Sequence, residues 1–309
     1  MPFVKKSFIV PQKIKAFLYL IREHNLSQGD AQRLIARGRM LIEGVSMTES
    51  SRTIEGAIEL VYFEPKGRGV LPLFETKDFM LFEKESGVLV HPNTMATEYS
   101  MLDEIRTLSG DYANAVHRID METSGLLMAS KHKGAESSLK MLFEKRGIKK
   151  SYLAWIDGKL TESFEVNEPL KVRNDYSTSK HKVEVHPEGK ASLTHFKPLK
   201  YDEELDATLI ACYPHTGRTH QIRVHLFHVK HPILGDPIYG TSFQISNDYL
   251  EGRLSAKDRE ITTGAGRLML HAQSLRFHFK SDFYLESRVD FEGMKSEIYA
   301  RNKRVFNRD

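Results

Sequence analysis

The most informative segment of this chain is His-Arg-Ile-Asp-Met-Glu-Thr-Ser-Gly-Leu-Leu, residues 117–127. It places a carboxylate, Asp120, two residues after Arg118 and shortly before a Thr-Ser-Gly run that leads into apolar residues. Threonine, serine and glycine favour turns and local side-chain hydrogen bonds, so Asp120 is expected on a structured bend. Because side chains alternate in extended backbone, Arg118 and Asp120 are predicted to share one side of the chain.

Two further segments bear on the function, since an aspartate before Thr-Ser-Gly can also be a capped turn without chemistry. One is Lys-Ser-Tyr-Leu-Ala at 150–154. The other is Thr-Gly-Arg-Thr-His-Gln-Ile-Arg-Val-His-Leu at 216–226, continuing to His-Pro-Ile-Leu-Gly-Asp-Pro-Ile-Tyr-Gly at 231–240. A helix beginning near Thr219 would place His220 and Arg223 on one face.

These three segments resemble the signatures of the RluA-type pseudouridine synthases, enzymes that isomerise uridine in RNA. The resemblance covers residues 70–280, and Ile119 stands where the family usually has leucine. It implies an α+β fold in which residues 66–309 form a catalytic domain. That domain would have a mixed, largely antiparallel sheet and a central cleft.

The resemblance also implies roles for individual side chains. Asp120 would be the catalytic carboxylate, and Arg223 would pair with it and keep it ionised and oriented. Tyr152 would lie against Asp120 and the target nucleotide, where its ring can stack and its hydroxyl can move a proton. Arg118 would fill the space left by a uridine flipped out of the RNA. The alternative for Arg118 is a phosphate contact or a salt bridge.

Pseudouridine formation breaks the N1–C1′ glycosidic bond, turns the uracil and rejoins it through C5. Such a reaction needs a carboxylate at the sugar face. Asp120 could attack C1′, act as a base at C2′ to give a glycal, or add to C6 of the base, and the sequence does not choose among these routes. No cofactor is expected, because the isomerisation is redox-neutral and uses no activated donor.

Arg218 and His220 are predicted to contact the RNA, Arg218 through a phosphate. Five histidines lie between residues 215 and 231, but their spacings of five, five, three and three residues do not place three on one helical face. No acidic residue or cysteine is interleaved at ligand spacing, so orienting hydrogen bonds are expected and no metal site is predicted.

Residues 1–65 are predicted to form a separate domain, which ends at the Pro-Lys-Gly-Arg-Gly linker of 65–69. Ser27 and Asp30 indicate a capped helix that stops at Gly38. Residues 39–45 are expected to form a strand that enters a glycine turn, and 58–62 another strand. This pattern resembles the small α/β S4 RNA-binding domain that often precedes the catalytic domain in this family.

Three arginines, Arg33, Arg37 and Arg39, cluster at the end of that helix and are predicted to bind RNA phosphates. The alternative is a solvated helix end whose basic residues the helix dipole favours. The basic C-terminus is a further phosphate contact or a solvated tail; its residues are Arg301, Lys303, Arg304 and Arg308.

In later parts of the chain, strands are expected at 79–82 and 87–92 and a helix at 134–145. A hairpin or loop is expected at 174–191. The polar stretch 241–266 is interpreted as an insertion.

The composition is that of an ordinary globular protein, with 309 residues, 40% hydrophobic and 28% charged. The formal net charge of +4 is compatible with a polyanionic partner. One cysteine, Cys212, excludes an internal disulfide and fits a reducing compartment. No run reaches the roughly 20 apolar residues of a membrane span, so a cytoplasmic protein that binds no membrane is expected. A monomer is the default expectation for its oligomeric state.

The predicted function is therefore an RNA pseudouridine synthase, acting on large-subunit ribosomal RNA or, as the alternative, on transfer RNA. One rival is a non-catalytic RNA-binding protein, such as a ribosome-assembly factor. The presence of Asp120, Tyr152 and Arg223 together argues against it. A second rival is a sugar hydrolase that pairs Asp120 with Glu122 or Asp236. It explains neither the S4-like region nor the 216–226 segment.

Overall fold

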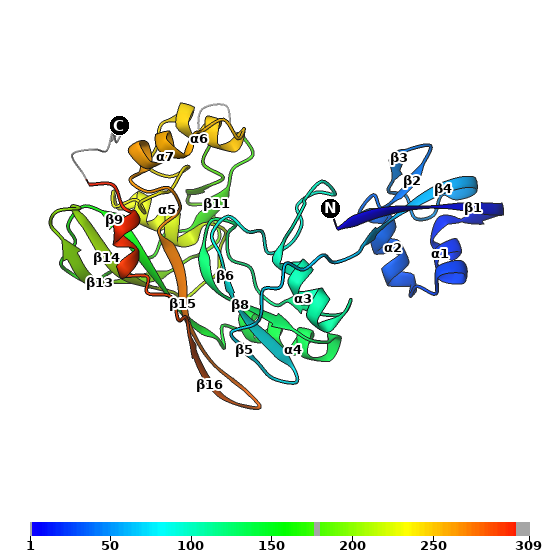
Figure 1. The fold of residues 1–309 in the computed structure, drawn as a ribbon, viewed down its shortest axis with the longest axis horizontal. Coiled ribbons are helices and arrows are strands. Elements are labelled where there is room, and N and C mark those ends of the chain that lie inside the picture. Colours follow the sequence, from blue (N-terminus) through cyan, green and yellow to red (C-terminus); the bar gives the residue numbers. More distant parts are fainter. Residues whose placement is uncertain (1, 176–179, 301–309) are drawn as a thin grey trace.

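The structure is a computed structural model, and it describes residues 2–175 and 180–300 of the chain. Figure 1 shows a small N-terminal unit at one end and a larger body that is built around one extended sheet. The basic C-terminal residues Arg301, Lys303, Arg304 and Arg308 lie outside the described residues. Within the described ranges, no helix has the length and apolar character that a membrane span requires.

The N-terminal unit is an α/β structure. In chain order it consists of β1 (Phe3–Lys15), α1 (Ala16–His24), α2 (Gln28–Ala36), β2 (Met40–Ile42), β3 (Val45–Met47) and β4 (Thr53–Phe63). The strands form an antiparallel sheet in the order β1-β4-β2-β3. A separate hydrophobic cluster holds the unit together, in which Leu20, Ile35 and Leu60 are completely buried.

The local predictions for this unit hold in part. Ser27 caps α2, because its Oγ accepts a hydrogen bond from the Asp30 backbone N–H at 3.2 Å. Residues 39–45, predicted as a strand that enters a glycine turn, are β2 and the tight turn that joins it to the first residue of β3. Glu43 and Gly44 make that turn, with φ angles of 51° and 77°.

The larger body contains the remaining elements. They are β5 (Phe74–Glu75), β6 (Phe79–Lys84), α3 (Met101–Ser109), β7 (Asn114–Ala115), β8 (Ser124–Ser130), α4 (Lys133–Glu144), β9 (Lys149–Asp157), β10 (Phe164–Val166), β11 (Leu170–Val172), β12 (Val183–Val185), β13 (Thr194–Asp202), β14 (Ala207–Pro214), α5 (Gln221–His228), α6 (Phe243–Leu250), α7 (Ala256–Thr263), β15 (Leu270–Phe279), β16 (Ser281–Glu286) and a short 3₁₀ helix (Gly293–Glu297).

Ten strands of this body form a single sheet whose main path is β10-β13-β14-β9-β15-β8-β6-β5. β16 pairs with β15, and β7 pairs with β8. Only the β15–β8 pairing is parallel among the pairings of the described strands, so the predicted mixed, largely antiparallel α+β fold is confirmed.

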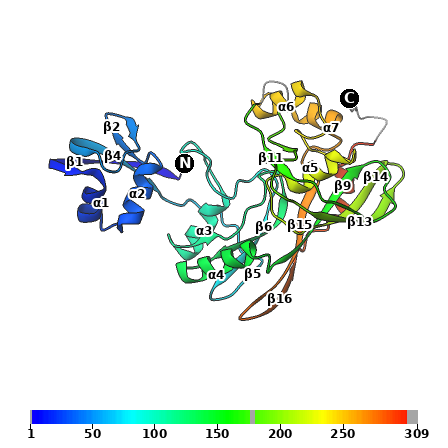
Figure 2. The ribbon, with the colours of Figure 1, turned by 180° about the vertical axis from the view of Figure 1, so that it is seen from behind.

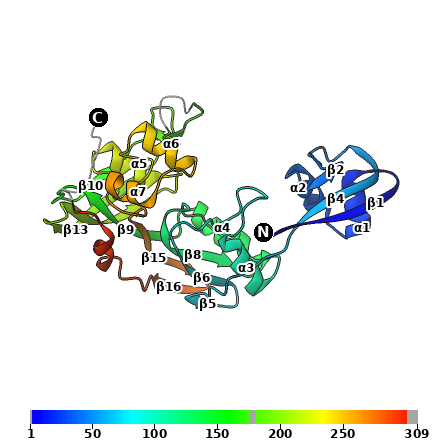
Figure 3. The ribbon, with the colours of Figure 1, turned by 45° about the horizontal axis from the view of Figure 1, so that its top comes forward.

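The helices cover different parts of the sheet, as Figures 1–3 show from three directions. α3 and α4 lie over the part formed by β6 and β8, on the side toward the N-terminal unit. Alternate residues of β6 and β8 point to opposite faces, and both faces are buried. Phe82 packs in one cluster with Ile105 of α3, whereas Leu81 packs in another with Leu139 of α4. α5, α6 and α7 lie at the other half of the sheet.

Three regional predictions have mixed outcomes. Residues 87–92 are not a strand but a series of bends, which corrects the expectation from their apolar composition. The 174–191 region does contain one strand of a hairpin, since β12 pairs with β11, although 176–179 lie outside the described residues. The polar stretch 241–266 contains the helices α6 and α7, each with a serine N-cap.

Candidate active site

A cleft of about 1610 Å³ runs along the large body, and residues of all three sequence signatures line it. Its walls include the loop before β8, the first residues of β9, and the segment that joins β14 to α5. Among the described residues, two acidic side chains face the cleft, Asp120 and Glu144. Eight basic residues face it: Arg118, Lys140, Arg146, Lys149, Lys150, Lys182, Arg218 and Arg223. The excess of positive charge suits a polyanion.

Asp120 lies on a structured bend, as predicted. The Thr123 backbone N–H donates a hydrogen bond to the Asp120 carbonyl at 3.1 Å, which closes a turn directly before β8. Residues 116–119 do not belong to a strand. Arg118 lines the cleft together with Asp120, as predicted, but His117 and Ile119 line it as well, so the side chains do not simply alternate between the cleft and the interior.

Arg223 of α5 joins Asp120 to a second carboxylate. Its Nη1 donates to Asp120 Oδ2 at 3.3 Å, while its Nε and Nη2 make a two-pronged contact with Asp236 at 2.7 and 2.8 Å. Burial alone would lower the pKa of Arg223, but Asp236 and Asp120 outweigh burial and raise it. Asp236 is also held by the backbone N–H groups of Ile238 and Tyr239. Arg223 is therefore a fixed, fully charged group behind Asp120.

His220 lies beside Asp120, but it does not belong to the helix. α5 begins at Gln221, and His220 precedes it in a left-handed conformation with φ of 53°, which corrects the predicted start near Thr219. Its Nε2 is 3.8 Å from Asp120 Oδ2, and a hydrogen bond of 2.9 Å joins its Nδ1 to the Tyr239 hydroxyl. Burial, helped by the charge of Arg223, lowers the pKa of His220 to about 4, so this histidine is neutral at pH 7.

Tyr152 comes from β9 and lines the same cleft. Its ring packs against the hydrophobic clusters on both sides, one with Phe82 and one with Trp155. Burial and the nearby charge of Asp120 raise the pKa of the Tyr152 hydroxyl, which therefore keeps its proton at neutral pH. The two side chains that the resemblance brought together are thus neighbours in the structure.

Lys84, at the end of β6, holds the backbone under the aspartate, and it was not among the residues predicted from the sequence. It is 1% exposed, and its ammonium donates to the carbonyls of Glu85, Val88 and Met121. Burial lowers the pKa of Lys84 to about 7, against the opposing charges of Asp120 and other acids. The signal that the sequence offered was a lysine directly before a tight turn. Turn carbonyls can gather around a buried ammonium, which needs such partners.

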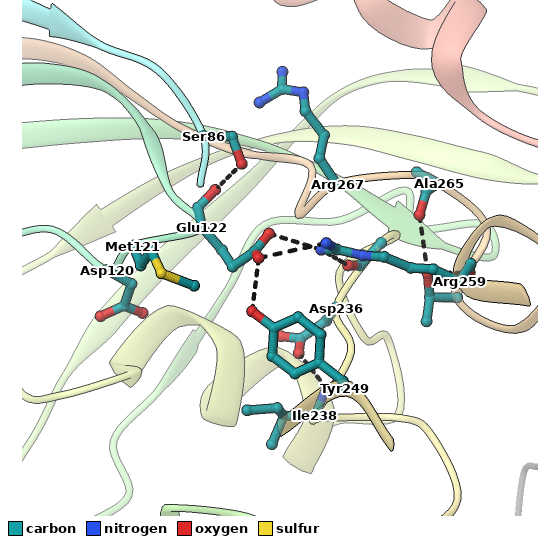
Figure 4. Close-up of polar contacts among 12 residues, drawn as sticks. Ser86, Asp120, Met121, Glu122, Asp236, Ile238, Tyr249, Arg259, Ala265 and Arg267 are labelled. Atoms are coloured by element: carbon teal, nitrogen blue, oxygen red, sulfur yellow. Dashed lines mark hydrogen bonds and ion pairs between the residues drawn. The ribbon is translucent and has the colours of Figure 1, made fainter. Parts of the chain in front are cut away.

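Glu122 is a further buried charge, which the sequence suggested only as a rival catalytic carboxylate. Figure 4 shows it turned away from Asp120 toward α6 and α7. Tyr249 of α6 donates to Glu122 Oε1 at 2.6 Å, and Arg259 of α7 donates to Oε2 at 2.7 Å. Burial would raise the pKa of Glu122, but Arg259 and Tyr249 lower it overall. Nothing in its local sequence could reveal partners from the 241–266 stretch.

The other predicted RNA contacts are dispersed. Arg218 is exposed at the cleft, and its Nε donates to the Ala191 carbonyl at 3.3 Å. Arg33 pairs with Asp30 at 2.6 Å on the surface of the N-terminal unit.

Arg37 and Arg39, in contrast, lie near Arg106 of the larger body. Burial, together with the charges of Arg37 and Arg106, lowers the pKa of Arg39 to about 10. His91, which lines the cleft, is within reach of the charges of Arg37, Arg106 and Arg118. Positive charge therefore extends from the N-terminal unit to the cleft.

The described residues contain no group of three or more histidine, cysteine, aspartate or glutamate side chains arranged to hold a metal ion. His225 is instead hydrogen bonded within the protein, to Ser192 and Thr194 at 3.0 Å each. His231 contacts the Asp157 carbonyl at 2.8 Å.

Comparisons with known proteins agree with this geometry. The family model described as RNA pseudouridylate synthase matches residues 78–228. A protein from Helicobacter pylori strain J99, named an uncharacterized RNA pseudouridine synthase, is 37% identical over 286 residues, which are 92% of this chain and 94% of that protein. Ribosomal large subunit pseudouridine synthase C of Vibrio parahaemolyticus is 34% identical, covering 73% of this chain and 67% of that protein.

A solved structure shares the fold. Human RNA Pseudouridylate Synthase Domain Containing 1 superposes with a TM-score of 0.57 at 24% sequence identity, covering 74% of this chain and 86% of that one. The sequence signatures, the sheet, the cleft around Asp120 and these relatives lead to one conclusion. The chain belongs to the RluA-type RNA pseudouridine synthases and is an isomerase that acts on RNA.

Proposed function

We propose that this enzyme isomerises uridine in the cleft, with Asp120 as the carboxylate at the sugar face. One observation carries the proposal: Asp120 is partly exposed, at 27% of its side chain, while Arg223 holds it from the buried side. A reactive carboxylate needs both access to the ribose and a fixed orientation. Attack at C1′, proton abstraction at C2′ and addition to C6 all begin from such a carboxylate.

Tyr152 and Arg118 complete the proposed catalytic arrangement. The protonated hydroxyl of Tyr152 lies near Asp120 and is suited to donate or relay a proton as the uracil turns. Arg118 is exposed at the cleft two residues from Asp120, where it can occupy the space of a uridine flipped out of the RNA. Arg218 and His220, which line the same cleft, would contact the bound RNA as well.

The sugar-hydrolase alternative needs a second available carboxylate near Asp120. Glu122 and Asp236, the two candidates, each bind an arginine, Arg259 and Arg223 respectively. This engagement favours isomerisation with Asp120 as the one accessible carboxylate of the three.

Large-subunit ribosomal RNA is the proposed target, with transfer RNA as the alternative. The support is the name of relatives such as the Vibrio parahaemolyticus protein, a ribosomal large subunit pseudouridine synthase. Such a target implies a cytoplasmic location. A monomer is proposed, because a single chain supplies Asp120, Tyr152, Arg223 and the cleft around them.

Residues 1–65 are proposed to be an S4-like RNA-binding domain in front of a catalytic domain of residues 66–309. The support is the separate hydrophobic cluster of the N-terminal unit and its order of elements. Arg37 and Arg39 would bind phosphates of RNA that enters the cleft, since their charge is continuous with that of Arg106 and Arg118.

Release of tritium from RNA labelled at uridine C5 tests the proposal, because the C5 hydrogen is lost when the C1′–C5 bond forms. Large-subunit ribosomal RNA and transfer RNA, both lacking pseudouridine, are supplied in separate reactions. Wild-type enzyme should release tritium, and Asp120→Asn should release none while its Kd for RNA stays within a few-fold. Unchanged turnover by Asp120→Asn would refute the role of Asp120.

A further inference from the structure

The loop that carries Asp120 is held by groups from two separate parts of the chain. Lys84 donates to the Met121 carbonyl at 2.9 Å, and Ser86 Oγ donates to the Glu122 carbonyl at 2.6 Å. These contacts hold the backbone. The Glu122 side chain is held by a different region, the helices α6 and α7, through Tyr249 and Arg259 (Figure 4).

Arg259 contacts two loops at once. Its Nη2 donates to Glu122 Oε2 at 2.7 Å and to the Gly235 carbonyl at 2.9 Å. Gly235 directly precedes Asp236, the carboxylate that fixes Arg223. Arg259 therefore joins the loop of Asp120 to the loop that orients the partner of Asp120.

Two arginines thus bridge the same pair of loops. Arg223 joins Asp120 to Asp236, and Arg259 joins Glu122 to Gly235. On the first loop, only Met121 separates Asp120 from Glu122. On the second loop, Gly235 and Asp236 are adjacent in the chain. A displacement at one bridge is therefore transmitted to the other through a very short length of backbone.

Both loops are anchored beyond these bridges. Gly235 has φ of 77°, and a Cβ there would collide with the Arg267 carbonyl oxygen. Gly125 has φ of 104°, and a Cβ there would collide with the Ala272 carbonyl oxygen. Each loop is packed against backbone at its glycine, so both loops are fixed close to the residues that the two arginines join.

We propose that Arg259, together with Glu122 and Tyr249, positions Asp120 against Arg223, and that α6 and α7 exist in this enzyme partly to supply that bridge. The inference rests on the proposed function. Arg259 is a positioning residue and touches neither substrate nor reacting atoms. Its connection to Asp120 passes through Glu122 and Met121, and the Asp120–Arg223 contact of 3.3 Å is the distance that it controls.

Three variants and a matched control test the bridge under single-turnover conditions with the RNA that wild-type enzyme modifies. Arg259→Met removes both contacts with little change in volume. Glu122→Gln removes one charge, and Tyr249→Phe removes one hydroxyl. The control is Arg253→Met, since Arg253 lies on the same segment, is exposed, and pairs with its near neighbours Asp248 and Glu251.

Arg259→Met and Glu122→Gln should each lower the maximal single-turnover rate about 10- to 100-fold, as expected when a reacting group is misplaced by about 1 Å. The RNA concentration at half-maximal rate should stay within about two-fold of wild type. Tyr249→Phe should lower the rate less, and Arg253→Met should leave it unchanged. The double variant of Arg259 and Glu122 should be no slower than Arg259→Met, because both changes break one bridge.

A purely structural role would lower the melting temperature and the folded fraction while the rate per folded molecule stayed at the wild-type value, and that result would overturn the proposal. Should Arg259→Met fail to fold, Tyr249→Phe and Arg259→Lys decide: wild-type maximal rates in both would also overturn it. Activity in wild type with no effect of these variants refutes the bridge alone. No activity in wild type refutes the proposed function instead.

Discussion

Asp120 owes its orientation to a buried arginine that has two acidic partners. Arg223 is 3% exposed and carries its charge under all ordinary conditions, because Asp236 compensates the cost of burial. Such a pair is costly to break from one side, since the remaining charge stays buried without a partner. The site is therefore more sensitive to loss of Arg223 than to loss of a cleft arginine that faces solvent.

Arg223→Met is expected to destabilise the fold by about 3–5 kcal/mol, the range for an uncompensated buried charge, and to abolish isomerisation. Urea unfolding followed by circular dichroism measures the first effect. Arg218→Met is the control, because Arg218 is exposed and should change stability by less than about 0.5 kcal/mol. Equal stability of the two variants would contradict this account of the buried pair.

Tyr152→Phe separates packing from proton transfer. The ring of Tyr152 packs against buried clusters, and phenylalanine preserves that contact. If the hydroxyl moves a proton, the single-turnover rate should fall about 10²- to 10⁴-fold while the Kd for RNA stays within about two-fold. A rate within about two-fold of wild type would assign Tyr152 to stacking alone.

At the scale of elements, β8 depends on a close approach between two backbones. Gly125 pairs with Ala272 in the only parallel ladder among the described strands, and no side chain fits between them. The approach places the signature loop beside β15 and so fixes where β8 begins. A glycine in this position is required for packing as much as for its φ of 104°.

Gly125→Ala should therefore destabilise the protein by roughly 3 kcal/mol or more, combining backbone strain with overpacking. Gly252→Ala is the matched control, because Gly252 also has positive φ (71°) but nothing within 4 Å of the place that a Cβ would occupy. It should cost only about 1 kcal/mol. Thermal unfolding of both variants measures the difference, and similar losses would show that strain alone matters.

At the scale of the whole molecule, the arrangement of charge links the N-terminal unit to the cleft. The charge of Arg37 helps to lower the pKa of His91 at the cleft, whereas Arg33 forms an ion pair with Asp30 on its own helix. Two arginines at one helix end thus differ in their freedom to bind phosphate. This difference gives a control pair within a single surface.

Arg37→Gln should weaken RNA binding and reduce the slope of log Kd against log salt concentration by about 0.7–0.9, the loss of one phosphate contact. Arg33→Gln should change that slope much less, since Asp30 already neutralises Arg33. Fluorescence anisotropy with labelled RNA at several salt concentrations measures both slopes. Equal slopes in both variants and wild type would remove Arg37 from the proposed RNA path.

Stability should fall as the pH is lowered from neutral. Burial, with smaller effects of nearby cations, lowers the pKa of His117 to about 3 and that of His91, His220 and His271 to about 4. The unfolded chain binds protons at these groups below pH about 6.5, whereas the folded chain does not. Their contribution is therefore complete above about pH 6.5 and is lost as the pH falls toward 4.

Each such histidine adds at most about 1.4 kcal/mol per pH unit to this dependence. His117→Gln tests one of them. The Met128 backbone N–H donates a hydrogen bond to His117 Nε2 at 3.0 Å, and a glutamine side-chain oxygen can accept the same hydrogen bond. Urea unfolding at pH 7.5 and 5.5 should show a flatter dependence for the variant. An unchanged dependence would mean that His117 takes up its proton in the folded protein.

The family, the bend at Asp120, the cap at Ser27 and the grouping of Asp120, Tyr152 and Arg223 were all predictable from the amino-acid sequence, since short motifs and local hydrogen bonds carry that information. The class of sheet was predictable as well. A strand was wrongly expected at 87–92, where apolar composition was the main guide.

The pairing of charges, in contrast, became visible only in the folded molecule. Arg223 and Asp120 are 103 residues apart in the chain, and Arg259 and Glu122 are 137 residues apart. The family resemblance implied the first pair, but nothing local marked the second, because the sequence of a polar helix is the same whether its arginine meets solvent or a buried glutamate. Such pairs depend on how distant elements pack, and burial then makes the pairing obligatory.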